Sequence, residues 1–187
     1  MMAAYAKTFD LGSCRDLLGK LERELLRLEY SRDRADRADH AANFAVWAWQ
    51  LSNWVYAEIA TRTPLRMRLA DACGTSVEAL DLVAFQRYVQ GPRGCAGLAC
   101  CRAIATAILH VASDEDRPAT ESERAASTVI ALRPADLARE PDAELTAWQA
   151  SQWLLNMGDG GEAVPDIELF QDVLQFWTDF IYANHIA

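Results

Sequence analysis

The chain has 187 residues, of which 51% are hydrophobic and 24% are charged, and its net charge is −9. This length and composition are those of one globular domain, so we expect residues 1–187 to form a single domain. No stretch approaches the roughly 18 uninterrupted apolar residues of a membrane span, and the first residues lack the basic start and apolar run of a secretory signal. The five cysteines are odd in number and three lie close together, which does not suit a disulfide framework. These features disfavour a membrane or secreted protein and predict a cytoplasmic one.

Charge is distributed unevenly along the chain. Residues 113–187 carry 4 basic and 15 acidic side chains, a net charge of −11, whereas residues 61–112 carry 6 basic and 3 acidic side chains, a net charge of +3. Nucleic-acid binding normally needs a concentrated basic surface, which the acidic C-terminal third would oppose. We therefore expect a protein partner rather than a nucleic acid. The five arginines that could form a weak basic patch are Arg62, Arg66, Arg68, Arg87 and Arg93.

The first predicted helix begins at Ser13, with Asp16 three residues later as in a capping box. The charge-rich residues 31–39 then connect this helix to the next, or begin it. Leucines recur at three- and four-residue steps along the first helix, which places them on one buried stripe: Leu17, Leu18, Leu21, Leu25 and Leu28.

Residues 36–61 are predicted to form the central helix of the molecule. One face carries apolar residues with Glu58, and a second apolar strip lies roughly opposite. A helix that is apolar on two sides is buried by neighbours on both. The first face comprises Phe44, Trp47, Ala48, Leu51, Trp54, Val55 and Glu58, and the second Ala42, Ala45, Trp49 and Tyr56.

Three further helices are expected before residue 112. Thr63-Pro64 starts a short helix that Gly74 ends, and Thr75 with Glu78 forms a capping box for a helix that runs to Gly91-Pro92. Residues 94–111 form a helix of small side chains, which should pack tightly against the tryptophan-rich central helix.

The C-terminal third is expected to hold a small β element. Residues 113–123 are acidic and broken by a proline, which predicts a loop or a partly disordered linker. Residues 127–132 predict a short strand, and residues 150–157 and 162–164 a hairpin around a glycine-rich turn. Asp166 caps a last helix with a stripe of Phe170, Val173, Leu174, Trp177 and Ile181. The predicted fold is mainly α: a helical bundle with a small antiparallel β hairpin before a C-terminal helix.

Two groups of polar residues are candidate binding residues. Asn43, Gln50 and Asn53 fall on one side of the central helix, and if they are buried they must be hydrogen-bonded. The acidic segment at 113–123 contributes the second group, Asp114, Glu115 and Asp116, which could attract a basic partner.

The cysteines and His110 raise two alternatives. Cys95, Cys100 and Cys101, with His110, could be proposed as a metal site. Zinc sites usually use paired Cys-x2-Cys loops, however, and adjacent cysteines on one helix point about 100° apart. Buried core thiols explain the pattern better, and a helix C-terminal cap explains His110 better than a general base does. We predict no metal and no cofactor.

Two stretches resemble a group of uncharacterised helical proteins of bacteria and prophages. Residues 43–54, Asn-Phe-Ala-Val-Trp-Ala-Trp-Gln-Leu-Ser-Asn-Trp, are similar to a run of Asn-Phe followed by Thr-Ala-Trp-His-Leu-x-Asp-Trp in that group. Residues 101–110 are similar to a second run, Cys-Arg-Asp-Ile-Ala-Asn-x-x-Lys-His. The group's titratable set is replaced here by Gln50, Asn53, Thr106 and Leu109, and only His110 remains. If that set does chemistry in the group, the resemblance implies that this chain is impaired in it.

A fainter resemblance is to the HEPN ribonucleases, whose signature is Arg, four to six residues, then His. Arg102 and His110 are separated by seven residues and miss it, whereas Arg34 and His40 are separated by five and fit it. About 0.8 such matches are expected by chance in a chain this rich in arginine.

The sequence predicts a non-catalytic binding or regulatory protein that acts through a protein partner, in a mobile-element or defence setting. A homo-oligomer is left open. The alternative is a metal-independent ribonuclease of HEPN type, with Arg102 and His110 as its candidate catalytic residues.

Overall fold

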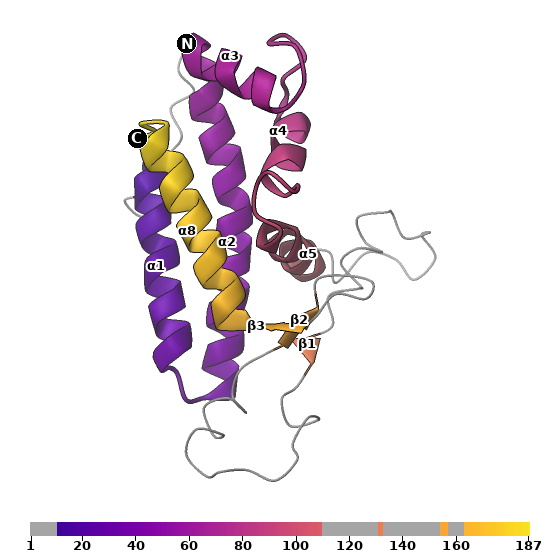
Figure 1. The fold of residues 1–187 in the computed structure, drawn as a ribbon. Coiled ribbons are helices and arrows are strands. Elements are labelled where there is room, and N and C mark those ends of the chain that lie inside the picture. Colours follow the sequence, from indigo (N-terminus) through magenta and orange to yellow (C-terminus); the bar gives the residue numbers. More distant parts are fainter. Residues whose placement is uncertain (1–10, 110–130, 133–153, 157–162) are drawn as a thin grey trace.

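The computed structural model describes residues 11–109, 131–132, 154–156 and 163–187. These residues form a mainly helical bundle with a short β element before the C-terminal helix, which confirms the predicted fold class (Figure 1). The long helices α1, α2 and α8 lie side by side, and the shorter α3, α4 and α5 follow one another along the other side of α2. None of the described helices is long and apolar enough to cross a membrane.

Helix α1 (Cys14–Tyr30) begins as the sequence predicts. The Ser13 hydroxyl accepts a hydrogen bond from the Asp16 backbone N–H at 3.1 Å, and the Asp16 carboxylate accepts one from the Gly12 N–H at 3.0 Å. These bonds satisfy backbone donors that a helix start leaves unpaired. The predicted stripe of five leucines is fully buried.

Helix α2 (Arg34–Thr61) is the central helix. It begins two residues earlier than predicted, because the Asp33 carboxylate accepts hydrogen bonds from the N–H groups of Ala35 and Asp36. Helices α1 and α8 contact it on one side and α3, α4 and α5 on the other, which confirms burial from two sides. Two tryptophan side chains of α2, Trp47 and Trp54, are half-buried at the edge of the side that faces the core.

Helix α3 (Thr63–Ala72) ends before Gly74, whose φ of +67° is a left-handed conformation that glycine adopts without strain. The sequence predicts that the next helix begins at Thr75, and this prediction is wrong. Residues 75–80 form a separate turn, in which the Ser76 hydroxyl accepts a hydrogen bond from the Ala79 N–H and the Leu80 carbonyl accepts one from the Tyr56 hydroxyl at 3.0 Å. Helix α4 (Leu82–Val89) begins after Asp81, whose carboxylate caps the Ala84 N–H at 2.7 Å.

Helix α5 (Gly97–Leu109) packs against α2 and α8. It begins three residues later than predicted, since the Cys95 N–H bonds back to the Val89 carbonyl at 2.7 Å. A Cβ atom on Gly97 would lie 2.7 Å from a Val173 methyl group of α8, so only glycine permits this approach. The small side chains of α5 thus allow the close packing that the sequence predicts.

The β element contains the predicted hairpin and, paired with it, the end of the strand predicted at residues 127–132. Strands β2 (Leu154–Asn156) and β3 (Ala163–Pro165) pair antiparallel, with Leu155 opposite Val164, and β1 (Ala131–Leu132) pairs with β2. The predicted turn at 158–161, the segment at 113–123 and most of the strand at 127–132 lie outside the described residues.

Helix α8 (Asp166–Ala183) closes the core against α1 and α2. Phe170 stacks on Phe44 of α2 with ring centroids 4.5 Å apart, and the indole N–H of Trp177 donates to the Ala48 carbonyl at 3.1 Å. Of the predicted stripe, only Leu174 is half-buried rather than buried. The last residues return to the start of α1, where the Cys14 N–H donates to the Ala187 carbonyl at 2.9 Å.

Candidate functional site

The predicted amide residues of α2 do not all lie together. Gln50 and Asn53 are half-buried, and the Asn53 Nδ2 group donates to Gln50 Oε1 at 2.7 Å. Asn43 lies two turns earlier on the same side of the helix and is exposed. The structure therefore joins two of the three candidate residues.

The hydrogen-bonded pair extends into a network with α4. The Gln86 Nε2 group donates to Asn53 Oδ1 at 3.0 Å and to the Ser52 hydroxyl at 3.1 Å, and Ser52 donates to the Trp49 carbonyl. Gln86 is 33 residues from Asn53, and no local pattern points to it. The network leads from the α2–α4 contact to Gln50 at the surface of α2.

Arg102, a candidate catalytic residue, is half-buried on α5. Its guanidinium carbon lies 5.6 Å from the centre of the Trp49 ring, within the range of a cation–π contact. His110 lies outside the described residues. A catalytic role for Arg102 together with His110 therefore stays a prediction.

A charged cluster between α1 and α2 was not found from the sequence. Glu24 is 3% exposed. Its Oε1 atom accepts hydrogen bonds from Lys20 at 3.1 Å and Arg27 at 3.0 Å, and its Oε2 atom lies 3.0 Å from His40 Nδ1. Because a carboxylate only accepts, His40 must carry its proton on Nδ1, which orients the ring. Arg34, the other half of the HEPN-like spacing, is exposed at the start of α2.

The Glu24 cluster holds a buried carboxylate in its charged form. Burial raises the pKa of Glu24, but hydrogen bonds from His40 and Lys20 lower it more, and the result is a pKa below the ordinary value of 4.5. A lowered pKa in the folded state means that the ionised carboxylate stabilises the fold. That contribution is present above about pH 4.5 and is lost as the pH falls through the lowered pKa.

We expect Glu24→Gln to lower the free energy of unfolding at pH 7, because the uncharged amide loses the attraction of Lys20, Arg27 and His40. The difference from wild type should shrink as the pH falls below about 4.5, where Glu24 of the unfolded chain takes up a proton, and it should be lost once the pH falls through the lowered pKa of folded Glu24. Urea unfolding of wild type and Glu24→Gln, at pH 7 and in acid, measures the difference in the free energy of unfolding at each pH. Glu22→Gln, at an exposed position of the same helix, is the control and should change little. A difference that is constant with pH would contradict this role for Glu24.

A second buried charge pair joins three helices. Arg37 and Asp166 are each 1% exposed in their side chains, and Arg37 Nη2 donates to Asp166 Oδ2 at 3.2 Å. Arg37 Nη1 also donates to the Leu28 carbonyl at the end of α1, at 2.6 Å. The pair attaches the first residue of α8 to the α1–α2 hairpin.

Cys100 and Cys101 are buried in the core, and Cys95 is half-buried. Burial raises the pKa of Cys100 to about 11 and that of Cys101 well above its usual range, so both are neutral thiols at pH 7. A neutral buried thiol is a poor nucleophile and a poor metal ligand. Within the described ranges, no three His, Cys, Asp or Glu side chains are grouped to hold a metal ion.

If these thiols serve only the core, a chelator should leave the thermal unfolding curve of the purified protein unchanged. Elemental analysis of the same sample should find no stoichiometric metal, because neutral Cys100 and Cys101 would have to lose a proton to bind one. About one equivalent of zinc per chain would contradict the core role.

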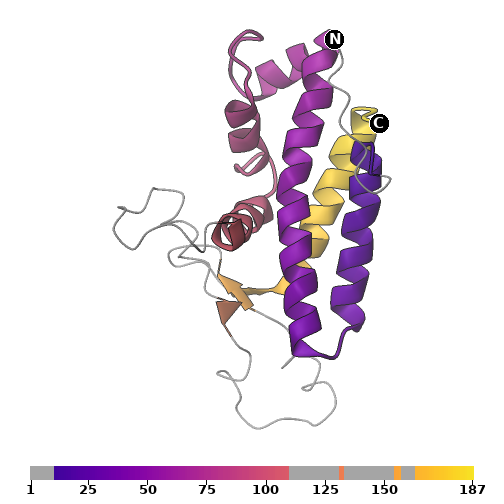
Figure 2. The same ribbon diagram turned by 180° about the vertical axis from the view of Figure 1, so that it is seen from behind.

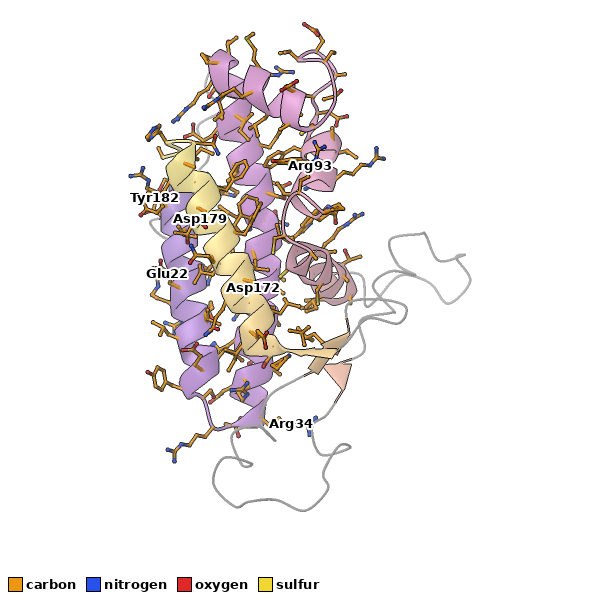
Figure 3. The ribbon with its side chains drawn as sticks, viewed as in Figure 1. Glu22, Arg34, Arg93, Asp172, Asp179 and Tyr182 are labelled. Atoms are coloured by element: carbon orange, nitrogen blue, oxygen red, sulfur yellow. The ribbon has the colours of Figure 1, made fainter. Side chains whose placement is uncertain are left out.

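The outer face of α8 is acidic. Glu168, Asp172 and Asp179 are exposed, and α8 contains no lysine or arginine. Figure 3 shows Asp172 and Asp179 along α8, whereas Arg93, which follows α4, lies farther to the right in the same view. The predicted acidic residues Asp114, Glu115 and Asp116 lie outside the described residues. The acidic character of the C-terminal third is therefore present at least on this helix.

Comparison of the chain with protein families, with curated protein sequences and with solved structures finds no match in any of the three.

Proposed function

We propose that this protein is a non-catalytic binding or regulatory protein of the cytoplasm, and that it acts by associating with a basic protein partner. The observation that carries the proposal is the exposed acidic face of α8, formed by Glu168, Asp172 and Asp179. A surface with one sign of charge attracts a partner of the opposite sign and raises the association rate.

The surroundings of these carboxylates support the proposal. Asp166, the remaining acidic residue of α8, is paired with Arg37 in the interior, so the three exposed carboxylates set the charge of the outer face. Helix α8 is also held firmly, because Trp177 and its neighbours anchor it in the core. A rigid helix presents charges in a defined arrangement, which reduces the entropy lost on binding.

Two arginines of the middle block contact other residues of the chain. Arg62 pairs with Glu58 at 3.2 Å, and Arg66 is half-buried. Arg68, Arg87 and Arg93 are exposed, and Asp71 and Glu78 are exposed in the same part of the chain. We therefore expect no detectable binding to generic RNA or duplex DNA at about 0.15 M salt, because few counterions would be released. Fluorescence anisotropy with labelled RNA and DNA measures this. Submicromolar binding would contradict the proposal and favour the ribonuclease hypothesis.

Affinity capture from host cells, with the wild type and two variants in parallel, tests the proposed function. The first variant is Glu168→Gln, Asp172→Asn, Asp179→Asn. The matched control removes the same charge elsewhere, at exposed Asp39, Asp71 and Glu78. Wild type and control should recover the same basic protein, and the α8 variant should lose it.

A partner that is recovered equally by all three proteins would contradict a role for the acidic face of α8. Recovery of nucleic acid that depends on Arg102 would contradict the protein-partner proposal itself. Replacing Asp114, Glu115 and Asp116 with Asn, Gln and Asn extends the test to the acidic segment at 113–123. If association then keeps its rate and its salt dependence, that segment is only a solvated linker.

A further inference from the structure

His40 is a half-buried histidine whose two ring nitrogens have different surroundings. Helices α1 and α2 run side by side along the bundle, and His40 of α2 contacts α1 through Glu24 (Figure 2). Its Nδ1 atom lies 3.0 Å from Glu24 Oε2, whereas no residue of the described ranges bonds to Nε2. Among the described side chains, the buried nitrogen and oxygen atoms without a partner are Nε of Arg37 and Nε of Arg66. Because Nε2 of His40 has no partner and is not one of these buried atoms, it is open to solvent.

The buried carboxylate decides which of these nitrogens can react. The pKa of Glu24 is below its ordinary value, so the carboxylate is ionised at neutral pH. A neutral His40 ring therefore carries its proton on Nδ1 and its lone pair on Nε2. A carboxylate that holds Nδ1–H fixes the orientation of the ring and makes the opposite nitrogen more basic. It also stabilises the positive charge that the ring gains when Nε2 forms a bond, which is how an oriented histidine is activated.

Two cations lie beside the Glu24–His40 pair. The second oxygen of Glu24, Oε1, accepts hydrogen bonds from Lys20 Nζ at 3.1 Å and from Arg27 Nη1 at 3.0 Å. Lys20 is also held 5.3 Å from the centre of the Trp47 ring, which restricts its position. The side chains of Lys20, Arg27 and His40 are 20%, 56% and 24% exposed, so all three are accessible to a ligand from solution. While His40 is neutral, the two cations and the one carboxylate leave a net charge of +1.

The neighbouring charges leave this balance unchanged. Arg23 lies one turn before Arg27 on α1, and Asp36 lies one turn before His40 on α2, so each is next to the site on its own helix. Both side chains are exposed and their charges are opposite. The site keeps one positive charge in excess, which favours an electrophile that is an anion. A phosphoryl group meets this requirement, because its oxygens are negative and accept strong hydrogen bonds from lysine and arginine.

We propose that His40 Nε2 accepts a phosphoryl group from a small phosphoryl donor, an acyl phosphate or a phosphoramidate. Lys20 and Arg27 bind the phosphoryl oxygens, and Glu24 holds Nδ1–H. With phosphoramidate, the Nε2 lone pair forms the new bond to phosphorus while the original P–N bond breaks, and ammonia leaves with the electron pair of that bond. The ring keeps its Nδ1 proton, and its new positive charge lies against the Glu24 carboxylate. This modification site goes beyond the proposed function and does not depend on it, because the acidic face lies on α8.

Reaction of the full chain with potassium phosphoramidate at neutral pH compares His40 with His185 in the same molecule. His185 is exposed after α8, and its ring contacts no carboxylate of the described residues. Mass spectrometry of peptides kept above neutral pH, where phosphohistidine is stable, gives the phosphorylated fraction at each site. His40 should react faster although it is the more buried of the two. An equal or faster reaction at His185 would overturn the proposal, because exposure alone would then set the rate.

Two variants separate the role of the carboxylate from that of the cations. Glu24→Gln should lower the rate at His40 about a hundredfold, as loss of a positioned acid–base partner does, and leave the rate at His185 unchanged. Circular dichroism checks that this variant is folded.

Arg27→Gln keeps the buried carboxylate and should slow the reaction of His40 with phosphoramidate, but not with diethyl pyrocarbonate, an uncharged reagent for neutral histidine. Arg23→Gln removes the same charge one turn away, without a contact to Glu24, and should slow it less. Phosphorus NMR should place the phosphoryl group on Nε2. Phosphorylation on Nδ1 would overturn the proposal, and so would a rate at His40 that neither Glu24→Gln nor Arg27→Gln changes.

Discussion

Replacing Trp177 with alanine should lower the free energy of unfolding by about 3–5 kcal/mol, as large aromatic deletions in well-packed cores do. The side chain is 0% exposed and packs edge-on against the rings of Phe176 and Phe180. Its indole N–H also donates to the Ala48 carbonyl, so the deletion leaves a cavity and removes a buried hydrogen bond between α8 and α2. Urea unfolding followed by circular dichroism measures the loss.

Trp54→Ala is the matched control, because Trp54 has the same size but is half-buried at the edge of the core. Its cost should be clearly smaller than that of Trp177→Ala. If the two variants are equally stable, Trp177 does not hold α8 against α2 as described.

Replacing Arg37 with methionine should cost about 3–5 kcal/mol, because it leaves the Asp166 carboxylate buried without its cation. The Leu28 carbonyl loses a donor at the same time. The double variant Arg37→Met, Asp166→Leu should be less destabilised than the single variant, since no buried charge remains. Thermal and urea unfolding of both variants measure this difference.

Arg32→Met is the control for the loss of a positive charge, because Arg32 is exposed between α1 and α2. It should change the free energy of unfolding by no more than about 0.5 kcal/mol. A double variant as unstable as Arg37→Met alone would show that Arg37 contributes through packing and not through its charge.

The local features of this fold follow from the sequence because their causes are local. The Ser13–Asp16 capping box and the leucine stripe of α1 depend only on residues three or four apart, and both are confirmed. The start of α4 was misplaced for a related reason. Thr75 and Asp81 both resemble helix caps. Asp81 is the residue that caps α4, and the turn before it contacts a distant residue, the Tyr56 hydroxyl of α2.

The buried polar groups could not be predicted, since their partners are distant in the chain. Arg37 and Asp166 are 129 residues apart, and each alone resembles a solvated helix residue. By its spacing along α1, Glu24 resembles the other charged residues of that helix. Only the packing of α2 against α1 places His40 beside it. Asn43, Gln50 and Asn53 were predicted as a polar group because they fall on one side of one helix. The structure joins only Gln50 and Asn53, and the link to Gln86 was not predicted.

The salt dependence of association with the captured partner tests the central claim most directly. Stopped-flow measurement of the association rate at rising salt, for wild type and for the variant at Glu168, Asp172 and Asp179, compares the two surfaces. Charges on an open surface are screened beyond about 8 Å at physiological salt. The wild-type rate should therefore fall steeply as salt rises, and the variant should associate more slowly and with a shallower dependence. Equal rates and equal salt dependence would show that the acidic face of α8 does not recognise the partner.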